Sequence, residues 1–144
     1  MKKLFFLILT LNYISLIAKA DTIDYWHVYY NNRKIKEFNQ NSTDRTIILG
    51  LQKIKAKDSL AVRYFNDTPC MECDTFLEFE DSEHNVVMTS KGKGTSNPIS
   101  FSLKRIIDVE KKINNGSIEI YYFEASSNRK THRIQLFKIV LSSV

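Results

Sequence analysis

The sequence predicts an all-β protein whose strands form an antiparallel β-sandwich. β-branched and aromatic residues are frequent, and short runs of alternating apolar and polar residues recur every ten to fifteen residues or so, separated by polar turns. No long run shows the three-and-four spacing of an extended helix. A small β-barrel is the alternative, although only 4 of the 144 residues are glycine, which disfavours a strongly coiled barrel.

A helical signal peptide is expected to precede the β domain, at residues 1–20. Lys2 and Lys3 open the chain, Leu4–Ile17 is mostly apolar, and Ala18 and Ala20 place small residues where a signal peptidase requires them. The apolar stretch is shorter than the roughly 20 residues that span a bilayer, which argues against the alternative of an uncleaved anchor. We therefore expect cleavage after Ala20, no stable membrane insertion afterwards, and a secreted or periplasmic protein.

Residues 21–144 are expected to form one domain that begins with a β-hairpin. In Asp24–Tyr30, alternation places one set of side chains on one face, namely Trp26, Val28 and Tyr30, and a second set on the other, namely Tyr25, His27 and Tyr29. Asn31-Asn32 predicts a two-residue turn, because asparagine tolerates a positive φ. Lys34–Phe38 would return as the second arm.

The rest of the domain continues as strands and turns. Further strands are expected at 46–49, 59–65, 75–80, 86–89, 99–103, 117–124 and 131–141. Residues 51–58 form a turn or a brief strand, residues 103–111 have helical spacing for one or two turns, and residues 91–98 form the loosest loop. In the last strand the apolar set shifts by one residue, which predicts a β-bulge near Leu136.

About eight or nine short strands in this order predict a sandwich that is immunoglobulin-like in architecture. The Cys-Trp-Cys spacing of immunoglobulin domains is missing, so the likeness concerns strand number and length alone.

The charge balance argues against nucleic acid as a partner. The precursor has a formal net charge of +5, and removal of Lys2, Lys3 and Lys19 with the signal peptide lowers it to +2. Much of the basic character therefore belongs to the targeting segment, and the domain lacks the strong positive charge that nucleic-acid binding requires.

Cys70 and Cys73 form the sharpest local motif. An oxidising compartment favours a structural disulfide, which here would stiffen the turn between two strands. Two alternatives remain open. A redox-active pair would need a helix N-terminus to lower the pKa of the first thiol, and a zinc site would need four ligands, whereas the remaining candidates His27, His84 and His132 are scattered. A c-type haem motif is excluded because residue 74 is aspartate.

Apart from the cysteine pair, no motif specific to catalysis, a metal or a cofactor is found. The carboxylates Glu78, Glu80, Asp81 and Glu83 cluster on one hairpin, where a solvated face is the ordinary explanation. Tyr25, His27 and Tyr29 are the candidate exposed patch for a ligand. We therefore expect a non-catalytic binding module for protein or glycan; the alternatives are an enzyme inhibitor or accessory subunit that uses residues 91–98 or the cysteine loop, and a thiol-active protein.

Overall fold

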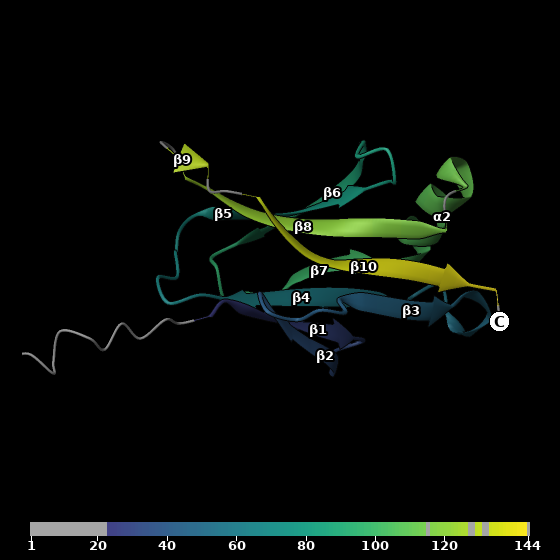
Figure 1. The fold of residues 1–144 in the computed structure, drawn as a ribbon, viewed down its shortest axis with the longest axis horizontal. Coiled ribbons are helices and arrows are strands. Elements are labelled where there is room, and N and C mark those ends of the chain that lie inside the picture. The colour runs from purple at the N-terminus through teal and green to yellow at the C-terminus, as the bar shows by residue number, and fades with distance from the viewer. Residues whose placement is uncertain (1–22, 115, 127–128, 131–132, 144) are drawn as a thin grey trace, which may run out of the picture.

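The computed structural model describes residues 23–114, 116–126, 129–130 and 133–143, and it forms two packed β-sheets (Figure 1). One sheet has the strand order β2-β1-β4-β7, and the other has the order β3-β10-β8-β5-β6 with β9 beside β8. The predicted signal peptide lies outside the described residues. The strands are β1 Tyr25–Tyr30, β2 Arg33–Asn39, β3 Thr46–Gly50, β4 Ser59–Phe65, β5 Asp74–Glu80, β6 Val86–Lys93, β7 Ile99–Ser102, β8 Ser117–Ser126, β9 Arg129–Lys130 and β10 Ile134–Ser142.

The all-β prediction and the two-sheet arrangement are confirmed, with one difference in strand direction. Strand β3 runs parallel to β10, whereas all other strand pairs among the described residues are antiparallel. A parallel pair needs a long connection between its strands. Here six strands and two helical segments separate β3 from β10 in the chain, and local alternation carries no information about such a distant partner.

The first hairpin has the predicted turn. Asn31 and Asn32 have φ values of 45° and 67°, the left-handed conformation that a tight two-residue hairpin requires. The last strand has the predicted bulge: Gln135 pairs with Tyr121 and Phe137 with Ile120, so that Leu136 is the extra residue. The bulge lets two successive side chains, Leu136 and Phe137, enter the core.

Two segments differ from the prediction. Residues 91–93 extend β6 instead of belonging to a loose loop, because they pair with residues 74–76 of β5. Residues 125–126 likewise extend β8. In both extensions, pairing with a neighbouring strand overrides a polar local sequence. The turn or brief strand expected at residues 51–58 contains a 3-10 helix, η1, at Leu51–Lys53.

The predicted helical turns form α2, Leu103–Ile113, which lies at one end of the sandwich (Figure 1). Leu103 and Ile106 are buried, so the helix anchors its first turns on the core. Asn114 ends it in the left-handed conformation with φ of 49°, and Lys111 and Lys112 complement the negative end of the helix dipole.

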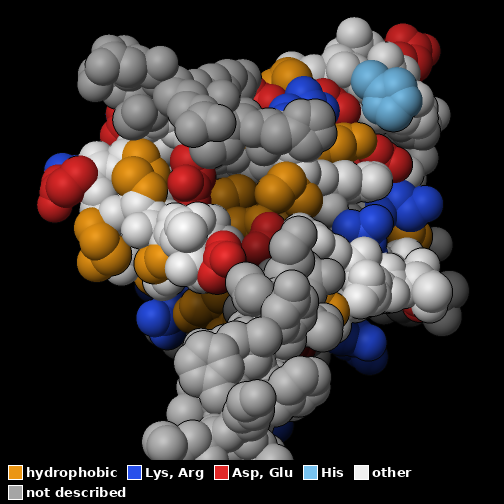
Figure 2. All heavy atoms as spheres, turned by 60° about the vertical axis from the view of Figure 1, so that its left-hand side comes forward, with side chains coloured by type: hydrophobic (Ala, Val, Ile, Leu, Met, Phe, Trp, Pro, Cys, Tyr) orange, Lys and Arg blue, Asp and Glu red, His pale blue; other side chains and the backbone are white. Residues whose placement is uncertain are grey.

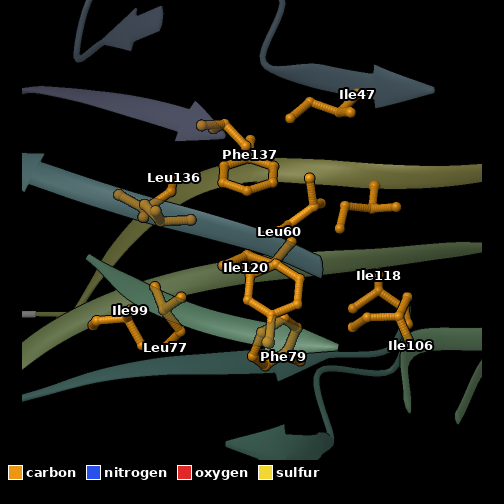
Figure 3. Packing of buried hydrophobic residues seen from close by; sticks show 14 of the residues in the cluster. Ile47, Leu60, Leu77, Phe79, Ile99, Ile106, Ile118, Ile120, Leu136 and Phe137 are labelled. Atoms are coloured by element: carbon orange, nitrogen blue, oxygen red, sulfur yellow. The ribbon is translucent and has the colours of Figure 1, made fainter. Parts of the chain in front are cut away.

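The core fills the space between the sheets (Figure 3). The alternation predicted for β4 holds, because Leu60, Val62 and Tyr64 are buried. From the other sheet Leu77 and Phe79 are fully buried as well. Outside the core, on the face shown in Figure 2, hydrophobic side chains lie in small groups among acidic and basic ones.

Candidate functional site

The predicted patch lies on the outer face of the sheet β2-β1-β4-β7. Trp26 and Val28 of β1 point inward and are fully buried, so the intervening side chains Tyr25, His27 and Tyr29 point outward. Tyr25 is exposed at 39 % of its surface, and the other two are half-buried. All three therefore lie on one surface beyond the core.

Strand β4 places two more side chains on this surface. The register pairs Tyr25 with Phe65 and His27 with Arg63. The rings of Tyr25 and Phe65 stack with centroids 4.7 Å apart and planes inclined by 11°, and His27 lies 5.0 Å from Phe65. We call Tyr25, His27, Tyr29, Arg63 and Phe65 the aromatic face.

Sequence reasoning missed Phe65 and Arg63 as members of this face. Alternation along β4 places Arg63 and Phe65 on one face of the strand and the buried Leu60, Val62 and Tyr64 on the other. This pattern indicates that Arg63 and Phe65 point away from the core. Alternation does not predict that β4 pairs with β1. Without this pairing, Arg63 and Phe65 cannot be placed beside Tyr25 and His27.

His27 is held by hydrogen bonds at both ring nitrogens. Nε2 lies 2.9 Å from Oε2 of Glu37 on β2, and Nδ1 lies 3.2 Å from the hydroxyl oxygen of Tyr29. The Lys34 ammonium donates a hydrogen bond of 2.9 Å to the same Glu37 carboxylate, and this bond is the main reason that the pKa of Glu37 lies below its usual value. The imidazole of His27 is therefore fixed in orientation, and the neighbouring Glu37 carboxylate already forms an ion pair with Lys34.

Arg63 is anchored from two sides. Its Nε–H donates to the carbonyl oxygen of Ser96 at 2.8 Å, and its guanidinium carbon lies 5.3 Å from the centroid of the Phe65 ring. The first contact joins the sheet to the turn between β6 and β7. The second is a cation–π contact, which favours a guanidinium flat against the ring.

A shallow groove adjoins the aromatic face. It has a volume of about 190 Å³ and is lined by Tyr29, Asn32, Ala61, Arg63, Pro98 and Ser100. Three strands contribute to it, β1, β4 and β7, together with the Asn31-Asn32 turn. It brings a tyrosine, a guanidinium and a hydroxyl together on the outer side of the sheet.

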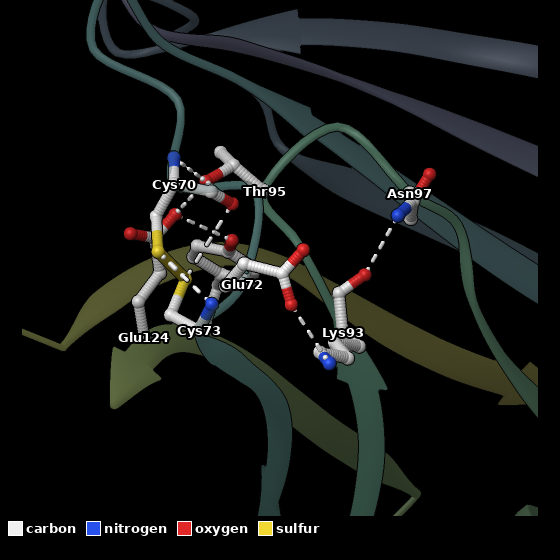
Figure 4. Close-up of a disulfide and its surroundings, with 8 residues drawn as sticks. Cys70, Glu72, Cys73, Lys93, Thr95, Asn97 and Glu124 are labelled. Carbon is white, nitrogen blue, oxygen red and sulfur yellow. Dashed lines mark hydrogen bonds and ion pairs between the residues drawn. A yellow bond between two sulfur atoms is a disulfide. The ribbon is translucent and has the colours of Figure 1, made fainter. Parts of the chain in front are cut away.

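The sulfur atoms of Cys70 and Cys73 lie within disulfide distance in the loop between β4 and β5 (Figure 4). Their Cα atoms are 5.8 Å apart, inside the range of disulfides. Cys73 is buried, whereas Met71 at the tip of the loop is exposed at 70 % of its surface. The loop is thus a small closed ring that presents one apolar side chain to solvent.

The turn between β6 and β7 holds the disulfide loop in place (Figure 4). The amides of Gly94 and Thr95 donate to the carbonyls of Cys73 and Cys70 at 2.9 and 2.8 Å. The Thr95 hydroxyl accepts from the Cys70 amide at 2.7 Å and donates to Glu124 Oε1 at 2.6 Å. Gly94 is required here, because its φ is 78° and an added Cβ would lie 3.0 Å from the Met71 carbonyl oxygen.

The carboxylates on the β5–β6 hairpin are partly structural instead of solvated. Glu80 is only 3 % exposed and forms an ion pair with Arg133, which also binds Glu78 at 3.2 Å and lies 4.0 Å over the Tyr121 ring. The expectation of a solvated face is therefore wrong for Glu80. Arg133, which directly precedes β10, compensates the buried charge of this carboxylate. His84 lies 3.5 Å from Glu80.

The histidines do not converge within the described part of the chain. His27 lies on the outer face of one sheet and His84 in a turn of the other, and His132 is outside the described residues. Across residues 23–114, 116–126, 129–130 and 133–143, no three side chains of His, Cys, Asp or Glu gather as metal ligands. The same residues include no helix that has the length and apolar character to cross a bilayer.

No protein-family model matches this chain, and no curated protein matches it either.

Proposed function

We propose that this protein is a small, non-catalytic binding module that is secreted or periplasmic and contacts a protein or a glycan through the aromatic face. The observation that carries the proposal is the stacked pair Tyr25 and Phe65, which lies beside His27 and Arg63 on a surface outside the core. Flat rings with polar neighbours are the side chains that binding surfaces favour. Both ring nitrogens of His27 are engaged, which suits a fixed contact surface.

Location and overall architecture are part of the same proposal. The basic start, apolar stretch and small residues of positions 1–20 support a cleaved signal peptide and export. The two packed sheets support an immunoglobulin-like arrangement of the strands. Expression of the full chain followed by mass spectrometry of the exported fraction should detect a protein that begins at Asp21; an intact chain found in the cytoplasm contradicts export.

Ligand binding is tested with the purified protein on a glycan array and in a screen of extracellular proteins. A ligand of the aromatic face should lose at least tenfold in affinity when Tyr25 and Tyr29 are both replaced by alanine. The matched control is Ile48→Ala with Val86→Ala, which removes two exposed apolar side chains from the other sheet. Equal binding by both double variants contradicts the proposed site.

An enzyme inhibitor or accessory subunit is the second candidate. The disulfide ring with Met71 at its tip supports it, because a rigid loop with an exposed apolar side chain loses little conformational entropy when it enters a cleft. In that case Met71→Ser should abolish capture of the target enzyme, whereas Tyr25→Ala with Tyr29→Ala should leave it intact. The opposite result favours the aromatic face.

A further inference from the structure

We infer that the groove beside Arg63 binds the carboxylate of an acidic sugar, so that the ligand is a glycan containing uronic or other carboxylated residues. The inference rests on the proposed function and narrows it to one class of ligand. Three features support it: Arg63 has a positive charge, its side chain is held in position, and the other lining residues can contact a sugar ring.

Arg63 brings an uncompensated positive charge to the groove. Among the described residues no carboxylate lies within ion-pair distance of its guanidinium. Glu37, which neighbours the aromatic face on β2, is already engaged by His27 and Lys34, each at 2.9 Å. A ligand carboxylate would therefore meet a guanidinium with no carboxylate partner and would not displace an existing ion pair.

The orientation of Arg63 is set before a ligand arrives. The Ser96 carbonyl oxygen accepts a hydrogen bond from Nε–H, and the guanidinium carbon lies 5.3 Å from the centroid of the Phe65 ring. No acceptor in the described part of the chain occupies either Nη group, so both remain for a planar two-oxygen group. Arginine binds carboxylates in this two-point manner, and a guanidinium that is already fixed loses less entropy on binding.

The remaining lining residues fit a sugar ring. Tyr29, Asn32 and Ser100 provide hydroxyl and amide groups for hydroxyls of the ligand, and Ala61 and Pro98 provide apolar contact for a ring face. The volume of about 190 Å³ is below the range of roughly 300–1,000 Å³ of typical small-molecule pockets. The groove therefore accommodates one unit of a longer chain, and the aromatic face extends from it as a platform for the next units.

The test uses the purified protein and four carboxylated glycans, namely polygalacturonate, alginate, hyaluronan and sialyllactose. Each is compared with its methyl ester or carboxyl-reduced form by calorimetry. At least one acid form should bind, and its neutral form should bind roughly ten- to a hundredfold more weakly, as expected for the loss of hydrogen bonds to a charged group.

Two variants locate the binding. Arg63→Gln should lower the affinity of the acid form by about the same factor as esterification, so that the variant no longer distinguishes the acid form from the neutral form. Ser100→Trp fills the groove from an exposed position on β7 without altering Arg63 and should also abolish the preference for the acid. Arg105→Gln, on the exposed surface of α2, is the matched control for loss of one positive charge.

The outcomes separate this inference from the proposed function. A neutral glycan or a protein that binds through Tyr25 and Tyr29 overturns the inference and supports the proposed function. Binding of an acidic peptide through Arg63, with no glycan bound, overturns the choice of a glycan. Absence of binding to all four carboxylated glycans, or unchanged affinity in Arg63→Gln, overturns the inference, and failure of the wider ligand screens as well overturns the proposed function.

Discussion

Arg63 on β4 donates its Nε–H to the carbonyl oxygen of Ser96 at 2.8 Å, although the two residues are 33 positions apart in the chain. Ser96 directly follows Gly94 and Thr95, whose amides are bonded to the carbonyls of the disulfide loop. The loop, the turn and the arginine are thus connected by hydrogen bonds. The disulfide therefore helps to position one wall of the groove as well as closing its own ring.

Reduction of the disulfide should loosen this turn. The chain-entropy relation for a ring of this size gives a loss of about 2 kcal/mol in the free energy of unfolding. Amide exchange at Gly94 and Thr95 should accelerate, because their acceptors are loop carbonyls. Urea unfolding and hydrogen exchange with and without reductant measure both effects. Cys70→Ser with Cys73→Ser should not respond to reductant, and coincident curves for the wild-type protein in the two conditions would contradict the prediction.

Thr95→Val should destabilise the fold by about 1–3 kcal/mol. Valine keeps the shape of the side chain but removes the hydroxyl that accepts from the Cys70 amide and donates to Glu124, in a site that is 1 % exposed. Denaturant unfolding measures the loss. Thr89→Val, at an exposed position of β6, is the control and should change stability by less than about 0.5 kcal/mol. Equal effects of the two variants would rule out a structural role for the hydroxyl.

Asp58 should make stability depend on pH between about 4 and 2. Hydrogen bonds from the Tyr30 hydroxyl, the Lys55 amide and the Asn31 side chain lower the pKa of Asp58 to about 2 from an ordinary value of 3.8. Because the folded state favours the ionised Asp58 carboxylate more than the unfolded state does, these hydrogen bonds stabilise the fold above pH 4. This contribution is lost as the pH falls through 2 and the carboxylate becomes protonated in the folded state.

Urea unfolding of the wild type and Asp58→Asn across this range tests the prediction. The stability difference between them should be largest above pH 4 and should shrink as the carboxyl of the wild type becomes protonated. Asp67→Asn, on an exposed turn, serves as the control and should follow the wild-type profile. A difference that stays constant from pH 5 to pH 2 would contradict the assignment.

Leu136→Ala should cost about 2–5 kcal/mol, because the β-bulge turns this fully buried side chain into the core. Ile48→Ala removes an aliphatic side chain that is 70 % exposed and should cost less than about 0.5 kcal/mol. Thermal and urea unfolding compare the two. A small loss for Leu136→Ala would show that the bulge does not direct this residue inward.

Most of the strands could be predicted because alternation is a local property. A residue on β4 such as Val62 has a side chain on the opposite face from Arg63 whatever partner the strand acquires, and the Asn31-Asn32 turn depends on the φ tolerance of its own residues. The shift in the apolar set around Leu136 predicted the bulge for the same reason. The sequence alone thus determined the two faces of the strands and the position of the first turn.

Only the tertiary structure decided which faces meet. The parallel partner of β3, the stacking of Phe65 on Tyr25 and the hydrogen bond between Arg63 and Ser96 each join segments that are distant in the chain. Such contacts depend on which strands share a sheet and on the path of the connecting turns. Strand order and turn path are in turn set by the burial of apolar side chains throughout the core. The sequence therefore determined that Tyr25, His27 and Tyr29 share a face, and the pairing of β4 with β1 and β7 decided that Arg63 and a groove lie beside them.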